Sequence, residues 1–95
     1  MTQLMKQSDG VVMLVGDIDF ASVVALQKEG LTLLQNSPAL CIDFSETGRT
    51  GSAAGALLIA WLRYARAQQK VLQLRNMPLH LQRVLKVSGL GSLIS

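Results

Sequence analysis

The sequence is poor in the residues that carry catalysis, metal binding and cross-linking. Its 95 residues include one Cys, one His and six acidic residues. A lone Cys41 cannot form an internal disulfide, which favours a reducing compartment such as the cytoplasm. No Cys or His spacing matches the paired ligands of a zinc site, so we expect neither a metal nor a cofactor. The sequence also offers no nucleophile–base pair, and we predict that the chain is not an enzyme.

Charged and aromatic residues are also scarce. Charged residues make up 16% and aromatic residues 4% of the chain, against 49% hydrophobic residues. This composition excludes a disordered chain, which would be polar and highly charged. A formal net charge of +3 and so few aromatic side chains give no base-stacking platform, so we expect no nucleic-acid binding. A surface so poor in charge suggests that a protein partner covers part of it.

Long apolar runs are missing as well. The longest, from Gly51 to Leu62, is interrupted by Ser52 and is shorter than the roughly 20 residues that cross a bilayer. The first residues do not match a signal peptide. We therefore predict a cytoplasmic protein without direct membrane insertion. The length predicts one domain over residues 1–95.

The hydrophobic pattern predicts alternating strands and helices. Strands are expected at 3–7, 11–15, 40–44 and 71–74, with a brief last strand at 93–94, and helices at 23–35, 53–69 and 79–87. An Asp9-Gly10 turn would join the first two strands. The order predicts an α/β fold with crossover helices.

Several local features refine this prediction. The apolar run Val11–Val15 suits a strand covered on both faces, and Gly16 would end it. Ser22 is expected to be the N-cap of the first helix. Residues 45–50 are expected to form a loop. Ser88-Gly89 would end the third helix, whose residues Leu81, Val84, Leu85 and Val87 are expected to face inward.

Three acidic residues follow the predicted strands. Asp17 and Asp19 bracket Ile18 and could bind a cation or cap the following helix, and capping is the commoner use. Asp43 ends a strand at the level where α/β sheets build their sites, so it is a candidate functional residue. His80 is expected to be a surface or capping residue, and Cys41 a buried small hydrophobe.

The segment Gly48-Arg49-Thr50-Gly51-Ser52 precedes the second predicted helix. It has two glycines before a helix but lacks the Lys-Ser/Thr pair of a phosphate-binding loop. Arg49 and the start of the helix could hold an acidic side chain from a partner.

The second predicted helix is apolar on more than one side. Leu57 or Leu58, Trp61 and Ala65 can face the core. Three alanines, at 53, 56 and 60, form a second small apolar strip that another backbone could approach closely. Either a neighbouring element of the same chain covers this strip or a protein partner does, and we predict a partner-binding face.

Four segments together resemble the STAS domain family. Gly16-Asp17-Ile18-Asp19 resembles its Gly-x-Leu-Asp element, and Ile42-Asp43-Phe44-Ser45 its central strand. The helix that Ser52 opens falls where the family has an Asp-Ser-Ser-Gly-Leu motif. Residues 81–90 resemble its closing helix and turn. The resemblance covers nearly the whole chain and implies a small mixed sheet of four to five strands, with helices largely on one side.

The resemblance also implies the function of a non-catalytic interaction module. Anti-sigma-factor antagonists of the family are switched by phosphorylation of a Ser at the start of the second helix. MlaB-like members bind the ATPase of a phospholipid-transporting ABC complex, which maintains outer-membrane lipid asymmetry. In one register the motif Asp falls on Gly51, the first hydroxyl on Ser52 and the phosphoacceptor on Ala53, so the switch would be lost. A register shifted by one residue would make Ser52 the acceptor.

These resemblances favour an accessory subunit that binds and supports such an ATPase. It would be peripheral to the inner membrane through the ATPase and its membrane permease. The expected partner-binding residues are Arg49, Thr50, Ser52, Ala53 and Ala56. The alternative is an anti-sigma-factor antagonist in a kinase-controlled system, with Ser52 as the phosphorylation site.

Overall fold

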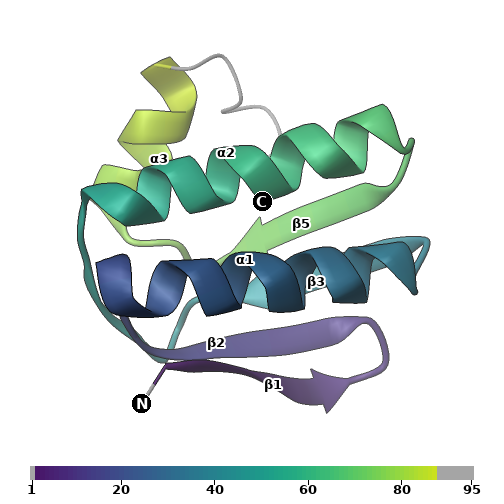
Figure 1. The fold of residues 1–95 in the computed structure, drawn as a ribbon, viewed down its shortest axis with the longest axis horizontal. Helices are drawn as coiled ribbons and strands as arrows, with labels where there is room; N and C mark the ends of the chain where they lie inside the picture. Colours follow the sequence, from purple (N-terminus) through teal and green to yellow (C-terminus); the bar gives the residue numbers. More distant parts are fainter. Residues whose placement is uncertain (1, 88–95) are drawn as a thin grey trace.

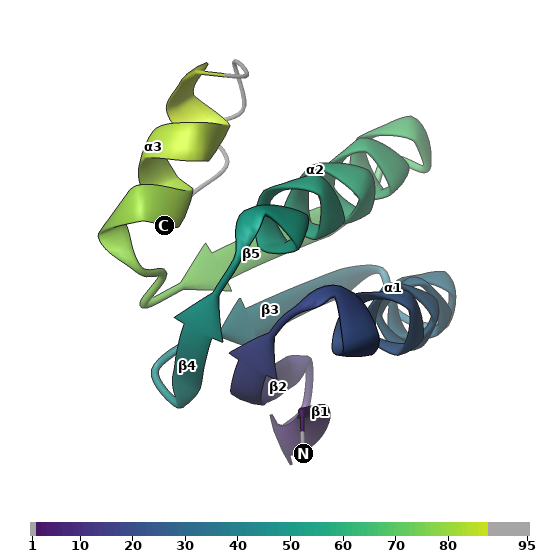
Figure 2. The ribbon, with the colours of Figure 1, turned by 60° about the vertical axis from the view of Figure 1, so that its left-hand side comes forward.

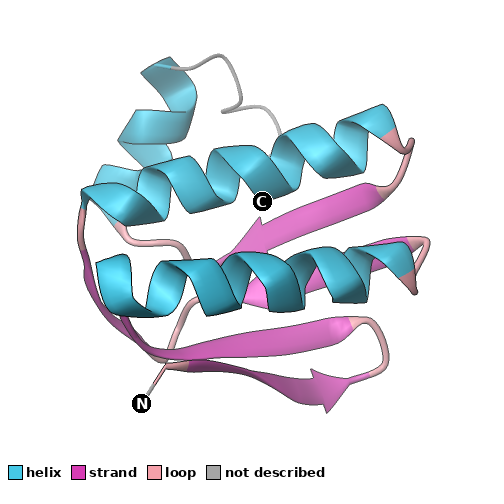
Figure 3. Ribbon diagram, viewed as in Figure 1, coloured by secondary structure: helices cyan, strands magenta, loops and turns pink. Residues whose placement is uncertain are grey.

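The computed structural model describes residues 2–87. In this range helices α1 and α2 lie side by side over one face of a mixed sheet, and α3 packs beside the first turns of α2 (Figures 1 and 3). The elements are β1 (Gln3–Ser8), β2 (Val11–Ile18), α1 (Phe20–Gln35), β3 (Ala39–Asp43), β4 (Thr47–Thr50), α2 (Ser52–Ala67), β5 (Val71–Arg75) and α3 (Leu79–Val87). The predicted fold, a mixed sheet of four to five strands with helices largely on one side, is confirmed.

The sheet has the order β1-β2-β3-β5, and β4 pairs with the far end of β2. Strands β1 and β2 form an antiparallel hairpin. Gly10 has φ 75° at its turn, a conformation that glycine adopts without strain. The predicted Asp9-Gly10 turn is confirmed. Strand β3 pairs in parallel with both β2 and β5, as the crossover connections through α1 and α2 require.

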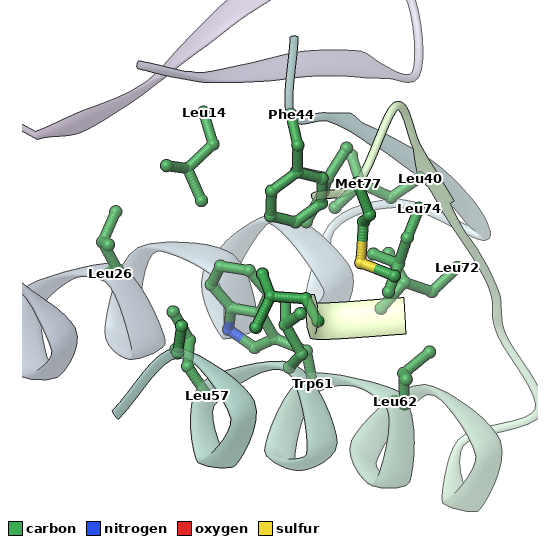
Figure 4. Packing of buried hydrophobic residues seen from close by; sticks show 14 of the residues in the cluster. Leu14, Leu26, Leu40, Phe44, Leu57, Trp61, Leu62, Leu72, Leu74 and Met77 are labelled. Carbon is green, nitrogen blue, oxygen red and sulfur yellow. The ribbon is translucent and has the colours of Figure 1, made fainter. Parts of the chain in front are cut away.

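Trp61 occupies the centre of the core between α1, α2 and the sheet (Figure 4). Its side chain is fully buried, and its Nε1 donates a hydrogen bond to the carbonyl oxygen of Gln27 at 3.3 Å. The ring lies against Gly30 so closely that a Cβ at that position would overlap it. Aliphatic side chains from the sheet, from α1 and from the inward side of α2 surround the indole. Cys41 is buried as predicted.

Helix α1 begins three residues earlier than the sequence predicted. Its N-cap is Asp19, whose carboxylate accepts from the backbone N–H of Ser22 at 2.9 Å. Ser22 stands at the third helical position, and its hydroxyl accepts from the backbone N–H of Asp19 at 3.1 Å. The prediction of Ser22 as N-cap is therefore wrong. Both residues belong to one reciprocal capping box, in which Asp19 holds the outer place.

Strand β2 continues past Gly16, where the sequence predicted its end. Gly16 has φ 104°, so the chain bends there and still pairs onward to Ile18. The pairing partner is β4, within the segment 45–50 that was predicted to be a loop. The four residues of β4 have no alternation of apolar and polar side chains that would predict a strand. β4 forms because it pairs with the extended end of β2.

The faces of β2 differ in their burial. Val12 and Leu14 point to the helices and are buried. Val11, Met13 and Val15 point to the opposite face and are only half-buried. The prediction of a strand covered on both faces is wrong, because the described helices pack on one face of the sheet only (Figure 3).

Helix α3 begins at the predicted residue and continues to Val87, the last residue described, and its inward side is narrower than predicted. Leu81 and Leu85 are buried. Val84 lies against Gly55 of α2 but is 41% exposed, whereas Val87 is 90% exposed, so the prediction that Val87 faces inward is wrong. Helix α2 ends at Ala67, two residues before the predicted end. The predicted Ser88-Gly89 helix end and last strand at 93–94 lie outside the described residues.

Candidate functional site

The candidate site is built where β4 leads into α2, beside the start of α3 (Figure 2). Hydrogen bonds hold β4 to the end of β2. The Thr47 hydroxyl donates to the carbonyl oxygen of Leu14 at 2.9 Å. The backbone N–H of Gly51 donates to the carbonyl oxygen of Ile18 at 3.1 Å. The backbone that enters α2 is therefore fixed by the sheet.

Asp17 adds a further hydrogen bond between β2 and β4. Its Oδ1 accepts from the backbone N–H of Arg49 at 2.7 Å. Gly48 leaves the space for that carboxylate, since a Cβ on Gly48 would overlap Oδ1. The Arg49 side chain is exposed. Asp17 therefore orients the backbone of β4, and Asp19 caps α1, so capping and backbone bonding account for the two carboxylates that bracket Ile18.

Helix α2 begins without a side-chain cap. Its N-cap is Gly51, which has no side chain to accept from the free backbone N–H groups, and the first turn contains no acidic residue. Ser52 is the first helical residue and is exposed. The positive end of the helix dipole thus faces solvent beside Arg49. This corner of the molecule favours a negatively charged neighbour over a positive one.

The three alanines of the predicted strip differ in exposure. Ala53 retains 8% of its surface, Ala60 is half-buried and Ala56 is exposed. Ala54, which follows in the chain, is fully buried. The exposed start of α2 therefore presents Ser52 and Ala56, with Ala53 mostly covered by its own chain. The predicted inward residues Leu57, Leu58, Trp61 and Ala65 are all buried.

His80 joins the site from α3, a contact that the sequence did not predict. Its Nε2 lies 2.5 Å from the hydroxyl oxygen of Thr50. Thr50 is half-buried and His80 is exposed. His80 was expected to be a surface or capping residue, and the surface position is confirmed. No local pattern could indicate the contact, because it depends on how the chain crosses from β5 to α3.

Asp43 lies outside this corner, at the end of β3, and is buried. Its Oδ1 accepts from the backbone N–H of Ser45 at 2.8 Å and from the Asn76 side-chain amide at 3.2 Å. These two hydrogen bonds, in that order, lower the pKa of Asp43 below its usual value. Asn76 has φ 58°, and its bond to Asp43 holds the β5–α3 connection. Asp43 is thus accounted for as a structural carboxylate.

The pKa of Asp19 is also lowered, chiefly by the backbone hydrogen bond from Ser22 and then by the bond from the Ser22 side chain. The charged form of Asp19 is the better cap for α1. Within residues 2–87 no three His, Cys, Asp or Glu side chains are grouped so that they could hold a metal ion. Over the same residues, no helix has the length and hydrophobicity that crossing a bilayer requires.

The structure brings together most of the predicted partner-binding residues. Arg49, Thr50 and Ser52 lie at one corner, and Ala56 lies one turn further along α2. Ala53 lies in the same turn but is buried. The arrangement offers a hydroxyl, a guanidinium and a small apolar surface. Such a corner can bind another protein.

Comparison with known proteins places the chain in a family. The family model described as "Mlab, STAS domain" matches residues 1–95. Comparison with the curated proteins finds no sequence match.

Among solved structures, three structures of two anti-sigma-factor antagonists have similar folds. One from Mycobacterium paratuberculosis is 26% identical, with a TM-score of 0.73 over 99% of this chain and 81% of that chain. The phosphorylated form of the Bacillus cell-fate determinant SpoIIAA is 20% identical, with a TM-score of 0.76 over 100% of this chain and 89% of that chain. The unphosphorylated form of SpoIIAA is 17% identical, with a TM-score of 0.71 over 90% of this chain and 82% of that chain.

Proposed function

The chain belongs to the MlaB-like STAS domain family, and from this membership we propose that it is the accessory subunit of a phospholipid-transporting ABC complex. STAS domains are generally non-catalytic modules that act through other proteins. In this proposal the chain is a single domain that binds the ATPase subunit and supports its assembly and activity. It is cytoplasmic and reaches the inner membrane through the ATPase and its permease. The transport it supports maintains outer-membrane lipid asymmetry.

The observation that carries the proposal is the surface at the start of α2. The phosphoacceptor of the family motif falls on Ala53 in the first register. Ala53 is buried and has no hydroxyl to phosphorylate. The register shifted by one residue makes Ser52 the acceptor and belongs to the second candidate function below. A surface without that switch suits a partner that stays bound, as a transporter subunit does.

Ser52 is the group that we propose meets the ATPase, with Arg49, Thr50 and Ala56 around it. It is exposed at the first position of α2. Its hydroxyl can donate or accept a hydrogen bond across an interface. Ala53 supports the same surface from beneath.

The second candidate function is an anti-sigma-factor antagonist. It is favoured by the three similar structures, which are all described as antagonists of this kind or as SpoIIAA. It requires that Ser52 is phosphorylated by a partner kinase. Phosphate would add about −1.5 to −2 charge at the helix start, where the dipole tolerates it.

A charge substitution at Ser52 tests the first proposal. We expect Ser52→Glu to weaken co-purification of the chain with the ATPase subunit, because it places a carboxylate inside the contact. Ser52→Gln is the matched control for size without charge, and it should retain most of the binding. Neither variant should unfold at a lower temperature than the wild type, since position 52 is exposed and a carboxylate at the helix start interacts favourably with the dipole. Normal co-purification of Ser52→Glu would reject the contact.

Incubation with the cognate kinase separates the two functions. Phosphate on Ser52, detected by mass spectrometry and lost in Ser52→Ala, would support the antagonist. A chain that stays unmodified and binds the ATPase supports the transporter subunit.

A further inference from the structure

The charges of the chain are divided between its two halves. All six acidic residues lie at or before Glu46, and no Asp or Glu follows it. Of the nine Lys and Arg residues, only Lys6 and Lys28 precede Arg49. The modest net charge of +3 thus conceals an acidic first half, with α1, and a basic second half, with α2, β5 and α3.

Among residues 49–87, most cations have no carboxylate partner within the described part of the chain. Within residues 2–87 the only salt bridge joins Lys6 to Asp9, in the first half. Two of the cations are engaged within the chain. Lys70 donates to carbonyl oxygens at the end of α1, and Arg75 lies near enough to Asp43 to help lower the pKa of that carboxyl. The remaining five are exposed: Arg49, Arg63, Arg66, Arg83 and Lys86.

Arg49 lies at the candidate site, and the other four cations lie along the two helices that start beside it. Ser52 and Arg63 are eleven residues apart on α2, about three turns, and so lie on the same side of the helix. Gly55 and Arg66 have the same spacing, and Gly55 faces Val84 of α3, where an added Cβ would stand 3.1 Å from Cγ1. Arg66 is therefore on the side of α2 that leans toward α3.

The start of α3 is held next to this surface. The Thr50–His80 contact fixes it beside β4, and Leu81 and Leu85 bury its inward side. Arg83 and Lys86 are left on its exposed side. Helices α2 and α3 together thus present a basic surface that runs from Arg49 and Ser52 outward, with no acidic residue in either helix.

We propose that the surface of α2 and α3 binds an acidic surface of the partner protein, whose carboxylates pair with Arg63, Arg66, Arg83 and Lys86. The inference rests on the proposed function, since it assigns the chemistry of the partner at that same site. The argument is charge complementarity. Exposed cations next to an uncapped helix start attract carboxylates and speed the encounter of the two proteins.

A protein fits this surface better than an anionic membrane. Surfaces that bind at the lipid interface add large apolar side chains, often aromatic, to their cations. After Glu46 the aromatic residues are Trp61 and Tyr64, of which Trp61 is fully buried and Tyr64 packs against the core. The large apolar side chains exposed on α3 are all aliphatic: Leu79, Val84 and Val87. The small Ala56 and Ser52 instead leave room for close contact with another backbone.

The test measures binding of the full chain to the ATPase subunit of the phospholipid transporter from the same organism. The dissociation constant is determined by titration calorimetry at about 50 mM and about 500 mM NaCl, a range over which screening of exposed charges changes strongly. The variant is Arg63→Glu combined with Arg83→Glu. The matched control is Lys28→Glu, an exposed cation on α1. Thermal unfolding verifies that each variant folds.

We expect wild-type affinity to fall as salt rises. The double variant should bind about tenfold more weakly or worse at low salt and lose most of the salt dependence. Lys28→Glu should bind within about twofold of the wild type, since its charge is remote from the interface.

Three results would overturn the inference. Binding of the double variant at wild-type strength refutes the acidic partner surface and leaves the proposed function intact. Binding of the wild type to phosphatidylglycerol vesicles that the double variant loses, with ATPase binding unchanged, assigns the basic surface to lipid. A wild-type chain that fails to bind the ATPase at either salt concentration refutes the proposed function itself, and this inference with it.

Discussion

The hydroxyl oxygen of Thr50 and Nε2 of His80 lie 2.5 Å apart, although the two residues are 30 positions apart in the sequence. Thr50 ends β4, which hydrogen bonds hold to β2, and His80 lies in the first turn of α3. The contact therefore couples the start of α3 to the start of α2. Binding at Ser52 and binding on α3 are expected to depend on each other through this contact.

Removal of the Thr50 hydroxyl tests this coupling. Thr50→Val keeps the shape of the side chain and deletes the bond to His80. A hydrogen bond of this kind contributes about 0.5–1.5 kcal/mol to stability, and we expect a loss at the lower end because His80 is exposed. Urea unfolding measures the loss. Binding to the ATPase subunit should weaken as well, because α3 is no longer fixed beside α2.

The matched control for this variant is Thr32→Val. The Thr32 hydroxyl donates to the carbonyl oxygen of Lys28 within α1, away from the proposed interface. This variant should bind the ATPase as the wild type does. If Thr50→Val also binds and unfolds as the wild type does, the Thr50–His80 contact has no role in holding α3.

Most of the fold could be predicted because its elements carry their own signals. Pro78 precedes helix α3, and the start of the helix at Leu79 was predicted without error. Strand β4 was missed because Thr-Gly-Arg-Thr has no alternation of apolar and polar residues. It forms through pairing with β2, a partner about thirty residues earlier in the chain, and the extension of β2 beyond Gly16 was missed for the same reason.

The candidate site shows the same division between local and distant signals. Arg49, Thr50 and Ser52 could be predicted together because they are neighbours in the sequence and precede an apolar helix. His80 could not, since only the path of the chain from β5 into α3 brings it to Thr50. The burial of Ala53 was also beyond the sequence, because alanine fits a helix surface and a helix interior equally well.

Gly30 is predicted to be indispensable for the packing of α1 against α2. An added Cβ would overlap the indole of Trp61, which is fully buried and has little room to move. Alanine gains about 1 kcal/mol in helix propensity over glycine. Displacement of the indole ring should cost more free energy than this gain. We therefore expect Gly30→Ala to lower the free energy of unfolding in urea by about 1–3 kcal/mol.

Gly55→Ala is the matched control for Gly30→Ala. At this position the added Cβ would lie 3.1 Å from Cγ1 of Val84, so a far smaller displacement is needed than at Gly30, where the nearest indole atom would lie at 2.3 Å. We expect a change within about 0.5 kcal/mol of the wild type. Equal losses for the two variants would contradict the role assigned to Trp61.

Lys70 is predicted to hold the end of α1. Its ammonium donates to the carbonyl oxygens of Leu34, of Gln35 at 3.0 Å and of Ser37 at 3.2 Å. A cation there satisfies unpaired carbonyls and interacts well with the negative end of the helix dipole. Lys70→Met should cost about 1–2 kcal/mol of stability. Lys28→Met, on the exposed side of α1, should leave the free energy of unfolding nearly unchanged, and an equal loss there would reject the role of Lys70.

Acidification should destabilise the protein through Asp43. The hydrogen bonds from Ser45 and then Asn76 lower its pKa in the folded state, below the value of about 3.9 expected for the unfolded chain. The folded state therefore favours the ionised carboxyl. Its contribution to stability is fully present above about pH 4 and is lost as the pH falls through the lowered folded value. Asp19, whose pKa is lowered by Ser22, adds to the same trend.

Unfolding by urea at pH values from 7 down to 3 measures this dependence. Asp43→Asn should be less stable than the wild type by about 1 kcal/mol at neutral pH, because a neutral acceptor makes weaker bonds to Ser45 and Asn76. It should also lose less stability on acidification, since asparagine does not titrate. Glu29→Gln, which removes an exposed carboxyl from α1, should follow the wild-type curve. If Asp43→Asn loses as much stability as the wild type between neutral and acid pH, Asp43 is not the source of the dependence.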